Sequence, residues 1–341
     1  MSDSFRARPR FSMDADRPDL AVLYEHPSWQ EPLFDALERR GLSYVAVDLK
    51  SATLSDRDRP RAPLYLNQAS PSAYTRDNTR AVPFALAMIE DLEARGCTVL
   101  NGSQPFRLEL SKMAQVSLMR ELGIDHPRTW AFNDVDALRD RRSELSFPAL
   151  IKPNQGGSGA RMIQVDSFEE LAATLEANPD LWHPDHLLLL QEYLPHDTEN
   201  EGIVRLEYLG GELLYAMRVV SKGNFNLCPS EVCNPASLDD SGGDGQPAEA
   251  AEETVDAGPD FYPYPDVPEA AVATGARIMQ EGAFDLGSVE YLETDDGRRV
   301  FYDVNANSNL RPPIGEAFGF DPFERVVDFL ERRRREVPAA G

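Results

Sequence analysis

Short apolar runs alternate with amphipathic stretches through the first hundred residues. Four of these runs are typical of buried strands: LAVLY at 20–24, SYVAVDL at 43–49, PLYLN at 63–67 and CTVLN at 97–101. Between the first two runs, Leu33, Phe34 and Leu37 fall on one face of a predicted helix, and a second helix is predicted around 80–95. Because strands that alternate with helices form parallel sheets, residues 18–103 are predicted to form a doubly wound, Rossmann-like α/β domain.

After residue 103 the pattern changes to hairpins separated by single helices. The predicted elements are a helix at 108–122, strands at 148–152 and 161–165, a helix at 168–177, a strand at 187–194, a hairpin turned at Gly210-Gly211, a helix at 269–282, a hairpin turned at Asp296-Gly297 and a helix at 321–335. Two-residue turns that contain glycine favour antiparallel pairing. We therefore predict two α+β subdomains, at 104–190 and 191–335.

Two segments fall outside this pattern. Residues 1–17 mix Arg, Ser and Asp without an apolar signal core, so we expect a disordered leader and no export. Residues 236–268 are rich in Asp, Glu, Gly, Ala and Pro and predict a flexible acidic insertion. A solvated loop is the usual interpretation of such a charge run, and a partner-binding segment is the alternative.

Composition narrows the functional classes. The formal net charge of −24 disfavours nucleic acid and anionic membranes as partners. No apolar run approaches the roughly 20 residues that span a bilayer. Three cysteines cannot form a disulfide framework, which fits a reducing, cytoplasmic location. The sequence leaves the oligomeric state open and allows a homo-oligomer.

One lysine stands out because lysine is rare in this chain. Only four of the 34 basic residues are lysines, and Lys152 ends an apolar run just before the loop NQGGSG. The backbone amides of a glycine-rich loop can turn toward an anion, and a neighbouring ammonium group would add to the attraction. The candidate anion-binding loop comprises Gly156, Gly157, Ser158 and Gly159. A plain glycine hairpin beside a surface lysine is the alternative.

A second candidate site lies on the last predicted hairpin. Glu290 interrupts one apolar strand, and Asp303 and Asn305 interrupt its partner strand. Side chains two residues apart leave a strand on the same face, so Asp303 and Asn305 can act together. Clustered carboxylate and amide oxygens suit a hard divalent cation. A solvated outer face is the alternative.

The order of these motifs resembles the ATP-grasp superfamily over about residues 105–330. The resemblance is closest to the branch of the ribosomal-protein glutamate ligase, glutathione synthetases and D-alanine–D-alanine ligase. The motifs that carry it are, in order, Lys112 before GIDHP, Lys152 in IKPNQGGSG, QEYL at 191–194, Arg205 and Arg218 before Lys222, and Glu290 with Asp303 and Asn305. The family usually has Asp at the position of Glu290 and Glu at that of Asp303.

The resemblance implies a role for each motif. Lys112, Lys152 and the glycine loop would bind ATP phosphates, and Glu199 (or Glu201) would hold the ribose. Backbone groups would form most of the adenine slot, at Gln191, Glu192, Tyr193 and Leu194. The metal set of Glu290, Asp303 and Asn305 would bind two Mg²⁺, which Mn²⁺ can replace. The cations expected to stabilise the phosphate or a substrate carboxylate are Arg205, Arg218 and Lys222; a surface position is the alternative for the last two.

The family chemistry implies that a carboxylate takes the γ-phosphoryl group of ATP and that an amine then displaces phosphate, forming an amide. We expect an amino acid or peptide as substrate. Its candidate ligands are Asn67, Ser70, Ser72 and Arg76 in one loop, and Asn224, Asn309 and Arg311 near the phosphate end. A turn stabilised by Asn and Ser is the alternative for the first group. A kinase-like phosphoryl transferase and a non-catalytic nucleotide-binding protein remain competing interpretations of the whole site.

Overall fold

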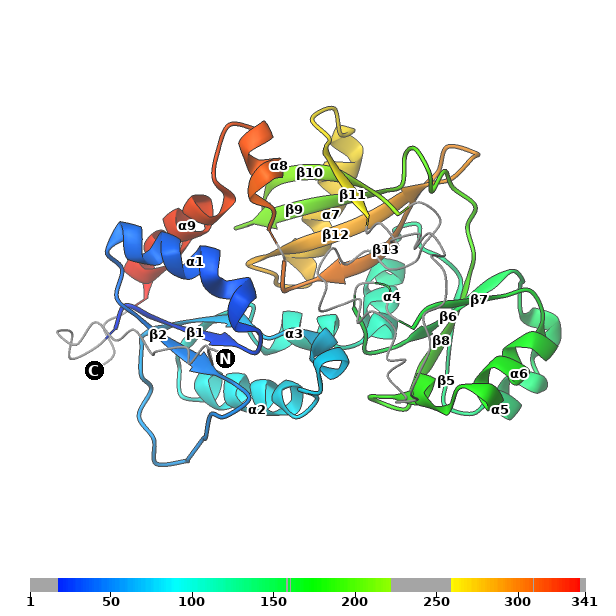
Figure 1. Ribbon diagram of the computed structural model, residues 1–341, viewed down its shortest axis with the longest axis horizontal. Helices are drawn as coiled ribbons and strands as arrows, with labels where there is room; N and C mark the ends of the chain where they lie inside the picture. The colour runs from blue at the N-terminus through cyan, green and yellow to red at the C-terminus, as the bar shows by residue number, and fades with distance from the viewer. Residues whose placement is uncertain (1–17, 158, 160, 222–258, 309, 338–341) are drawn as a thin grey trace, which may run out of the picture.

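The computed structural model describes residues 18–157, 159, 161–221, 259–308 and 310–337. In this part of the chain the strands form three sheets, and Figure 1 shows them as three neighbouring bodies. The candidate site residues that fall outside it are Ser158, Lys222, Asn224 and Asn309, together with the predicted leader 1–17 and most of the predicted insertion 236–268.

The N-terminal sheet is parallel, as the alternating pattern predicts. Its strands are ordered β2-β1-β3-β4 and span Leu20–Tyr24 (β1), Tyr44–Asp48 (β2), Leu64–Gln68 (β3) and Thr98–Leu100 (β4). Alternate residues of β1 enter two different cores, because Leu20 and Val22 pack with α1 (Pro27–Arg40) and Ala21 and Leu23 pack with α2 (Ala81–Ala94). The two helices therefore cover opposite faces of the sheet (Figure 1).

The second sheet is antiparallel and has the order β5-β8-β6-β7. Its strands span Thr129–Phe132 (β5), Ala149–Pro153 (β6), Ile163–Val165 (β7) and Leu188–Glu192 (β8). One face packs on helices α5 (Val135–Arg139) and α6 (Phe168–Ala177). Ser167 caps α6, since its hydroxyl oxygen accepts from the Glu170 N–H at 3.1 Å. The predicted strands of this sheet and the helix predicted at 168–177 are confirmed.

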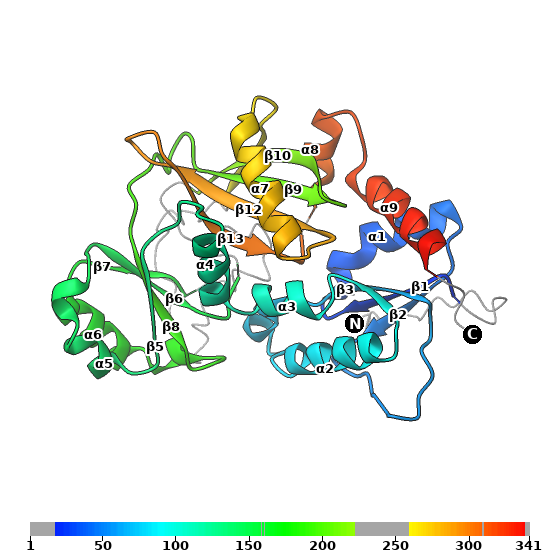
Figure 2. The same cartoon turned by 180° about the vertical axis from the view of Figure 1, so that it is seen from behind.

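The third sheet has five antiparallel strands in the order β11-β10-β9-β12-β13. They span Ile203–Leu209 (β9), Glu212–Val220 (β10), Asp260–Pro263 (β11), Leu286–Glu293 (β12) and Arg299–Asn305 (β13). Helix α7 (Glu269–Glu281) covers one face (Figure 2). Gly210 and Gly211 both have positive φ, of 63° and 86°, which suits the turn of a two-residue hairpin. Both predicted hairpins are confirmed.

Two expectations about these elements are wrong. The predicted helix 108–122 is split into α3 (Ser103–Glu109) and α4 (Lys112–Glu121), because the Ser111 hydroxyl accepts from the Ala114 N–H at 3.2 Å and starts a new helix. The C-terminal end of the predicted insertion is not a loop. Residues 260–263 form β11, which pairs with β10 at the edge of the third sheet.

The C-terminal helices tie the third sheet to the first. Helix α8 (Pro312–Ala317) follows β13, and α9 (Pro322–Glu336) packs beside α1 (Figures 1 and 2). Arg40 of α1 forms ion pairs with Asp328 and Glu331 of α9 at 2.8 and 3.0 Å. Such exposed pairs add little energy individually but fix the orientation of the two helices. No helix in the described part of the chain is long and apolar enough to cross a membrane.

Candidate functional site

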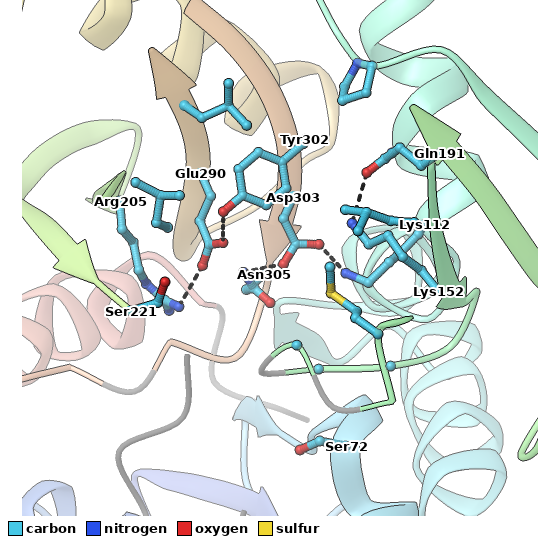
Figure 3. Close-up of a pocket in the computed structure, with 18 of the residues that line it drawn as sticks. Ser72, Lys112, Lys152, Gln191, Arg205, Ser221, Glu290, Tyr302, Asp303 and Asn305 are labelled. Carbon is cyan, nitrogen blue, oxygen red and sulfur yellow. Dashed lines mark hydrogen bonds and ion pairs between the residues drawn. The ribbon is translucent and has the colours of Figure 1, made fainter. Parts of the chain in front are cut away.

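A cavity of about 410 Å³ is lined by residues from the regions of all three sheets. Figure 3 shows its two charged sides facing each other. Lys112, Lys152 and Gln191 lie on one side, and Arg205, Glu290, Tyr302, Asp303 and Asn305 lie on the other. The structure therefore brings together two motifs that are about 150 residues apart along the chain.

Strand alternation directs Lys152 into this cavity. Leu150 and Lys152 of β6 line it, whereas Ala149 and Ile151 point into the hydrophobic core behind the sheet. Lys152 is 3% exposed, and its Nζ donates to Gln191 Oε1 at 3.0 Å. Burial, and then the charge of Lys112, lower the pKa of Lys152 to about 8. A buried ammonium group without an ion pair to a described residue suits an anionic ligand.

Lys112 is held beside Lys152 by the first residue of the glycine loop. Asn154 follows β6, and its Oδ1 accepts from the Met113 N–H at 3.1 Å, while its carbonyl accepts from the Lys112 N–H at 3.1 Å. These bonds fix the start of α4 to the start of the loop. The Lys112 ammonium forms an ion pair with Asp303 Oδ1 across the cavity (Figure 3).

The glycine loop lies against the N-terminal domain. A Cβ added at Gly157 would lie only 3.1 Å from the Cβ of Ser72, so glycine allows a close approach. Gln155 Nε2 also donates to the Pro71 carbonyl at 3.5 Å. Gly156, Gly157 and Gly159 all line the cavity. This contact lets a 3-10 turn of the first domain (Pro71–Arg76) form part of the pocket wall.

The acidic side depends on a β-bulge in β13. The hairpin pairs Tyr291 with Phe301, but it then pairs Glu290 with Asp303, so Tyr302 is an extra residue. Without this extra residue Glu290 would pair with Tyr302, and the Asp303 side chain would project from the opposite side of the sheet. The bulge places Tyr302 and Asp303 together on the cavity wall. Asn305 follows two residues later, and its Nδ2 donates to Asp303 Oδ2 at 3.3 Å.

Tyr302 is a site residue that the motifs did not identify. Its hydroxyl donates to Glu290 Oε2 at 2.9 Å, and its ring centroid lies 5.4 Å from Lys152 Nζ. Burial, followed by the charges of Glu290 and Asp303, raises the pKa of Tyr302 well above its ordinary value, so the hydroxyl stays a donor. Tyr302 thus connects the two charged sides of the pocket. Nothing in the sequence marks the bulge, so no signal could have found it.

Arg205 lies between two glutamates of the same sheet face. Its Nε donates to Glu207 Oε1 at 2.7 Å and its Nη1 to Glu290 Oε1 at 3.1 Å. Glu207 is fully buried, at 0% exposure, and its other oxygen accepts from the Ser308 hydroxyl. Burial alone would lower the pKa of Arg205, but these carboxylates raise it above its ordinary value. Arg205 lines the cavity, with its charge balanced by the protein itself.

Arg218 and Glu199 are not at the cavity. Strand β10 contains a register shift between Leu213 and Tyr215, so Arg218 pairs with Val204 and faces away from Arg205. On that other face it contacts Glu293 at 3.3 Å and stacks on Tyr264 at 4.5 Å. Glu199 is exposed in the loop after β8 and does not line the cavity. Neither placement supports the predicted phosphate or ribose role.

The predicted adenine slot forms one edge of the cavity. Gln191, Glu192, Tyr193 and Leu194 all line it. The Gln191 side chain, however, is used within the protein, since it accepts from Lys152 and its Nε2 donates to Thr129 Oγ1 at 3.0 Å. The side-chain amide of Gln191 therefore orients Lys152. Any contact between residues 191–194 and a base would involve the other groups of this segment.

The predicted substrate residues separate into two groups. Ser70, Ser72 and Arg311 line the cavity. Asn67 is buried behind it, where its side chain donates to the Asn101 carbonyl at 3.2 Å. Arg76 is also unavailable, because it forms a buried ion pair with Glu25 at 2.6 Å. Asn67 and Arg76 therefore have structural partners in place of a ligand.

Glu109 is a second site residue that the motifs missed. It ends α3, lines the cavity and is 3% exposed. Its Oε1 accepts from the Asn307 N–H at 3.0 Å, and its Oε2 has no hydrogen-bond partner among the described residues. Burial raises the pKa of Glu109 to about 8. A neutral carboxyl group at this position would cost less than a buried charge.

The acidic side has the donor chemistry that a divalent cation requires. Among the described residues no three His, Cys, Asp or Glu side chains converge, so the oxygen donors are two carboxylates and the Asn305 amide. Burial and the charge of Asp303 raise the pKa of Glu290. For Asp303, burial alone would raise the pKa, but Lys112 and Lys152 lower it below its ordinary value. Two carboxylates and an amide offer the kind of oxygen ligands that Mg²⁺ prefers.

Comparison with known sequences finds no matching family model. The chain spans only 7% of an acetyl-CoA carboxylase from Dictyostelium discoideum and 12% of a carbamoyl phosphate synthase large chain from Rubrobacter xylanophilus. It is 24% identical to a tetrahydromethanopterin:α-L-glutamate ligase from Methanosarcina acetivorans, over 88% of this chain and 94% of that protein. It is 38% identical to a D-alanine–D-alanine ligase from Nitratidesulfovibrio vulgaris, over 25% of this chain and 28% of that one.

Solved structures extend the likeness over most of the chain. A RimK-domain ATP-grasp protein from Sphaerobacter thermophilus has a TM-score of 0.64 at 19% identity, covering 91% of this chain and 98% of that one. The ATP-grasp ligase PsnB, in complex with a precursor variant, Mg and ADP, has a TM-score of 0.63 at 16% identity, covering 93% and 100%. A D-alanine–D-alanine ligase from Bacillus anthracis with ATP has a TM-score of 0.64 at 16% identity, covering 93% and 98%. The chain therefore has the ATP-grasp fold, which the order of its motifs predicted.

Proposed function

We propose that this protein is an ADP-forming carboxylate–amine ligase that uses ATP and two Mg²⁺ to join an amino acid or peptide to an amine. One observation carries the proposal: Lys112 and Asp303, from opposite sides of a single cavity, form an ion pair. A triphosphate needs cations on one side and metal ligands on the other, and this cavity offers both.

The two sides of the cavity have different proposed roles. Lys112, Lys152 and the amides of the glycine loop would hold the phosphates, while Glu290, Asp303 and Asn305 would hold the metal. When bound, ATP supplies the phosphoryl group and Mg²⁺ neutralises its charge. The ion pair between Lys112 and Asp303 would then exchange partners, with Lys112 turning to phosphate and Asp303 to the cation. Tyr302 and Arg205 would keep the Glu290 carboxylate oriented.

The proposed reaction proceeds in two displacements. A carboxylate oxygen of the substrate attacks the γ-phosphorus, and ADP leaves; an acyl phosphate results. The amine nitrogen then attacks the acyl carbon, phosphate leaves and the nitrogen loses a proton. A cavity that holds the acyl phosphate beside the amine would lower the entropic barrier to the second displacement. No nucleophilic side chain of the protein takes part.

Two relatives support an amino acid or peptide substrate. One is a glutamate ligase aligned along 94% of its length, and PsnB was solved with a peptide precursor. Ser70 and Ser72 supply hydroxyl groups from the first domain, and Arg311 supplies a cation from the third sheet's side of the pocket. Groups of these kinds suit the amide, hydroxyl and carboxylate groups of a peptide-like ligand.

A product screen tests the proposal. The full chain is incubated with Mg·ATP and pairs drawn from amino acids and dipeptides, ADP and phosphate are quantified, and products are identified by mass spectrometry. A ligase releases ADP and phosphate together only when acid and amine are both present. A stable phosphorylated product formed without an amine would identify a phosphoryl transferase and reject ligation. Lys152→Met is the matched inactive control.

A further inference from the structure

The two arginines that line the cavity differ in their partners. Arg205 is placed between Glu207 and Glu290 and forms ion pairs with both, at 2.7 and 3.1 Å. Arg311 forms no ion pair with any residue that the structure describes, although it also lines the cavity. The two residues share a wall of the pocket, so their surroundings can be compared directly.

The backbone of Arg311 is fixed from both directions. Its N–H donates to the Tyr215 hydroxyl at 2.9 Å, and its carbonyl accepts from Ile314 and Gly315 at 3.1 Å in the first turn of α8. Its guanidinium lies over the ring of Phe261, with Cζ 3.4 Å from the centroid. The side chain is therefore held in one place without being neutralised by a described carboxylate, because an aromatic face supplies only a partial counter-charge.

The carboxylate whose charge acts on Arg311 is already in use. Glu207 accepts from Arg205 on one oxygen and from the Ser308 hydroxyl on the other. Burial, together with the charge of Arg205, lowers the pKa of Arg311, even though Tyr215 and Glu207 oppose that change. A partly buried guanidinium that lacks an anion is unfavourable for the folded state, and residues of this kind are typical of ligand sites.

We propose that Arg311 is the recognition group for a carboxylate of the acid substrate, so that this substrate carries an anionic carboxylate rather than a neutral group at this point of the pocket. The proposal rests on the proposed ligase function and deepens it. A planar guanidinium can donate two parallel hydrogen bonds to a carboxylate. The Phe261 ring contacts the guanidinium, and among the described residues no acceptor takes a hydrogen bond from the Arg311 side chain.

Phosphate is the other anion that Arg311 could attract. The groups that suit phosphate lie on other elements than the neighbours of Arg311. Lys112 starts α4, Lys152 lies on β6, and the glycine loop follows β6. Arg311 lies beside Tyr215 of β10 and Phe261 of β11. We therefore assign the phosphates to the lysine side and the carboxylate to Arg311, and the experiment below treats the two anions separately.

Thermal unfolding of the full chain tests this assignment without requiring turnover. Failure of the ligase proposal and failure of the Arg311 proposal can therefore be distinguished. Wild type, Arg311→Met and Arg311→Lys are compared with saturating Mg·AMPPNP, and sodium acetate is titrated against acetamide at constant ionic strength. Acetate, but not its neutral isostere, should raise the melting temperature of the wild type. The rise should be lost in Arg311→Met and partly kept in Arg311→Lys, while the stabilisation by Mg·AMPPNP alone should be equal in all three.

Several results would overturn the proposal. These are an equal acetate response in wild type and Arg311→Met, no acetate response in the wild type, and an Arg311-dependent response to inorganic phosphate but not to acetate. If Arg311→Met fails to fold, the unaltered chain gives the answer: acetate should protect Arg311 from phenylglyoxal in peptide mass spectra, and acetamide should not. Equal labelling with both would reject the site. With an identified acid, Arg311→Met should raise its KM roughly 10- to 100-fold.

Discussion

Two register shifts in the third sheet act in opposite directions on the site. The shift in β13 inserts Tyr302 and brings Asp303 to the same face as Glu290. The shift in β10, between Leu213 and Tyr215, moves Arg218 to the face opposite Arg205. Strand spacing alone would place Arg205 and Arg218 together and separate Glu290 from Asp303. A single extra residue therefore decides which charged side chains share a pocket.

The comparison also separates charges that stabilise the fold from charges that serve a ligand. On the cavity face, Arg205 neutralises a glutamate that is fully buried, whereas Arg218 on the other face is partly exposed and pairs with Glu293. Lys152 of β6 and Arg311 before α8 also line the cavity and have no described carboxylate as an ion-pair partner. Substitutions on the two faces should therefore differ in the size of their effect. They should also differ in what they change, which is either the stability of the fold or the binding of a ligand.

The largest expected effect concerns the two arginines. Arg205→Met would leave the buried Glu207 without its ion pair, and we expect a loss of about 3–5 kcal/mol in the free energy of unfolding. Arg218→Met, its matched control on the face that α7 covers, should cost less than about 1 kcal/mol. Urea denaturation measures both. Equal losses in the free energy of unfolding would contradict the claim that the ion pair of Arg205 stabilises the fold more than that of Arg218.

The next effect concerns the metal ligands. Asp303→Asn should lower kcat by on the order of 100- to 1,000-fold and abolish the dependence on Mg²⁺, because one carboxylate of the pair is gone. Glu293→Gln, a carboxylate change on the opposite face of the same hairpin, should leave the Mg²⁺ titration unchanged. Rates measured over a range of Mg²⁺ concentrations decide this. An unaltered titration curve for Asp303→Asn would remove this residue from the metal site.

A pH dependence follows from Lys152. Since its pKa in the ligand-free fold is lowered to about 8, raising the pH above 8 removes its charge. The affinity for Mg·AMPPNP should therefore fall roughly tenfold between pH 7 and pH 9. Stability of the ligand-free protein should change in the opposite sense. The folded state loses this proton more readily than the unfolded chain, so the Lys152 contribution to the unfolding free energy rises from pH 8 upward.

Calorimetry at the two pH values measures the change in affinity, and Lys152→Met is the control. This variant should bind Mg·AMPPNP weakly, with little further change between pH 7 and pH 9. An identical pH dependence in wild type and variant would mean that another group causes it.

The smallest expected effect concerns the bulge residue. Tyr302→Phe removes the hydrogen bond to Glu290 but keeps the ring beside Lys152. We expect a loss of about 0.5–1.5 kcal/mol in Mg²⁺ binding, with the fold unchanged. Titration of Mn²⁺ as a paramagnetic substitute measures the affinity. A variant with the wild-type affinity would show that the hydroxyl does not orient the carboxylate.

The sequence predicts the fold and much of the site because both depend on local patterns. Alternation of strands and helices indicated the parallel sheet, turn residues indicated the hairpins, and Lys152 next to a glycine loop indicated the cationic side. The bulge at Tyr302 could not be predicted, because an extra residue in a strand leaves no mark on its composition. The same is true of Arg76, whose buried partner Glu25 lies 51 positions away.

The split between α3 and α4 is an intermediate case. Ser111 is a good N-cap residue, but the helical periodicity continues across it, so the pattern favoured one helix over residues 108–122. The contact that decides between the two comes from Asn154, which follows β6 and binds the start of α4. A local sequence pattern does not reveal long-range hydrogen bonds of this kind.

The central claim is that the lysine side and the acidic side hold one Mg-bound triphosphate between them. Calorimetric binding of Mg·AMPPNP and of AMP to wild type, Lys152→Met and Asp303→Asn tests it most directly. Both substitutions should weaken the triphosphate by more than tenfold and leave AMP affinity unchanged, since each loss of charge affects only the phosphate end. Wild-type affinity for Mg·AMPPNP in either variant would contradict the claim.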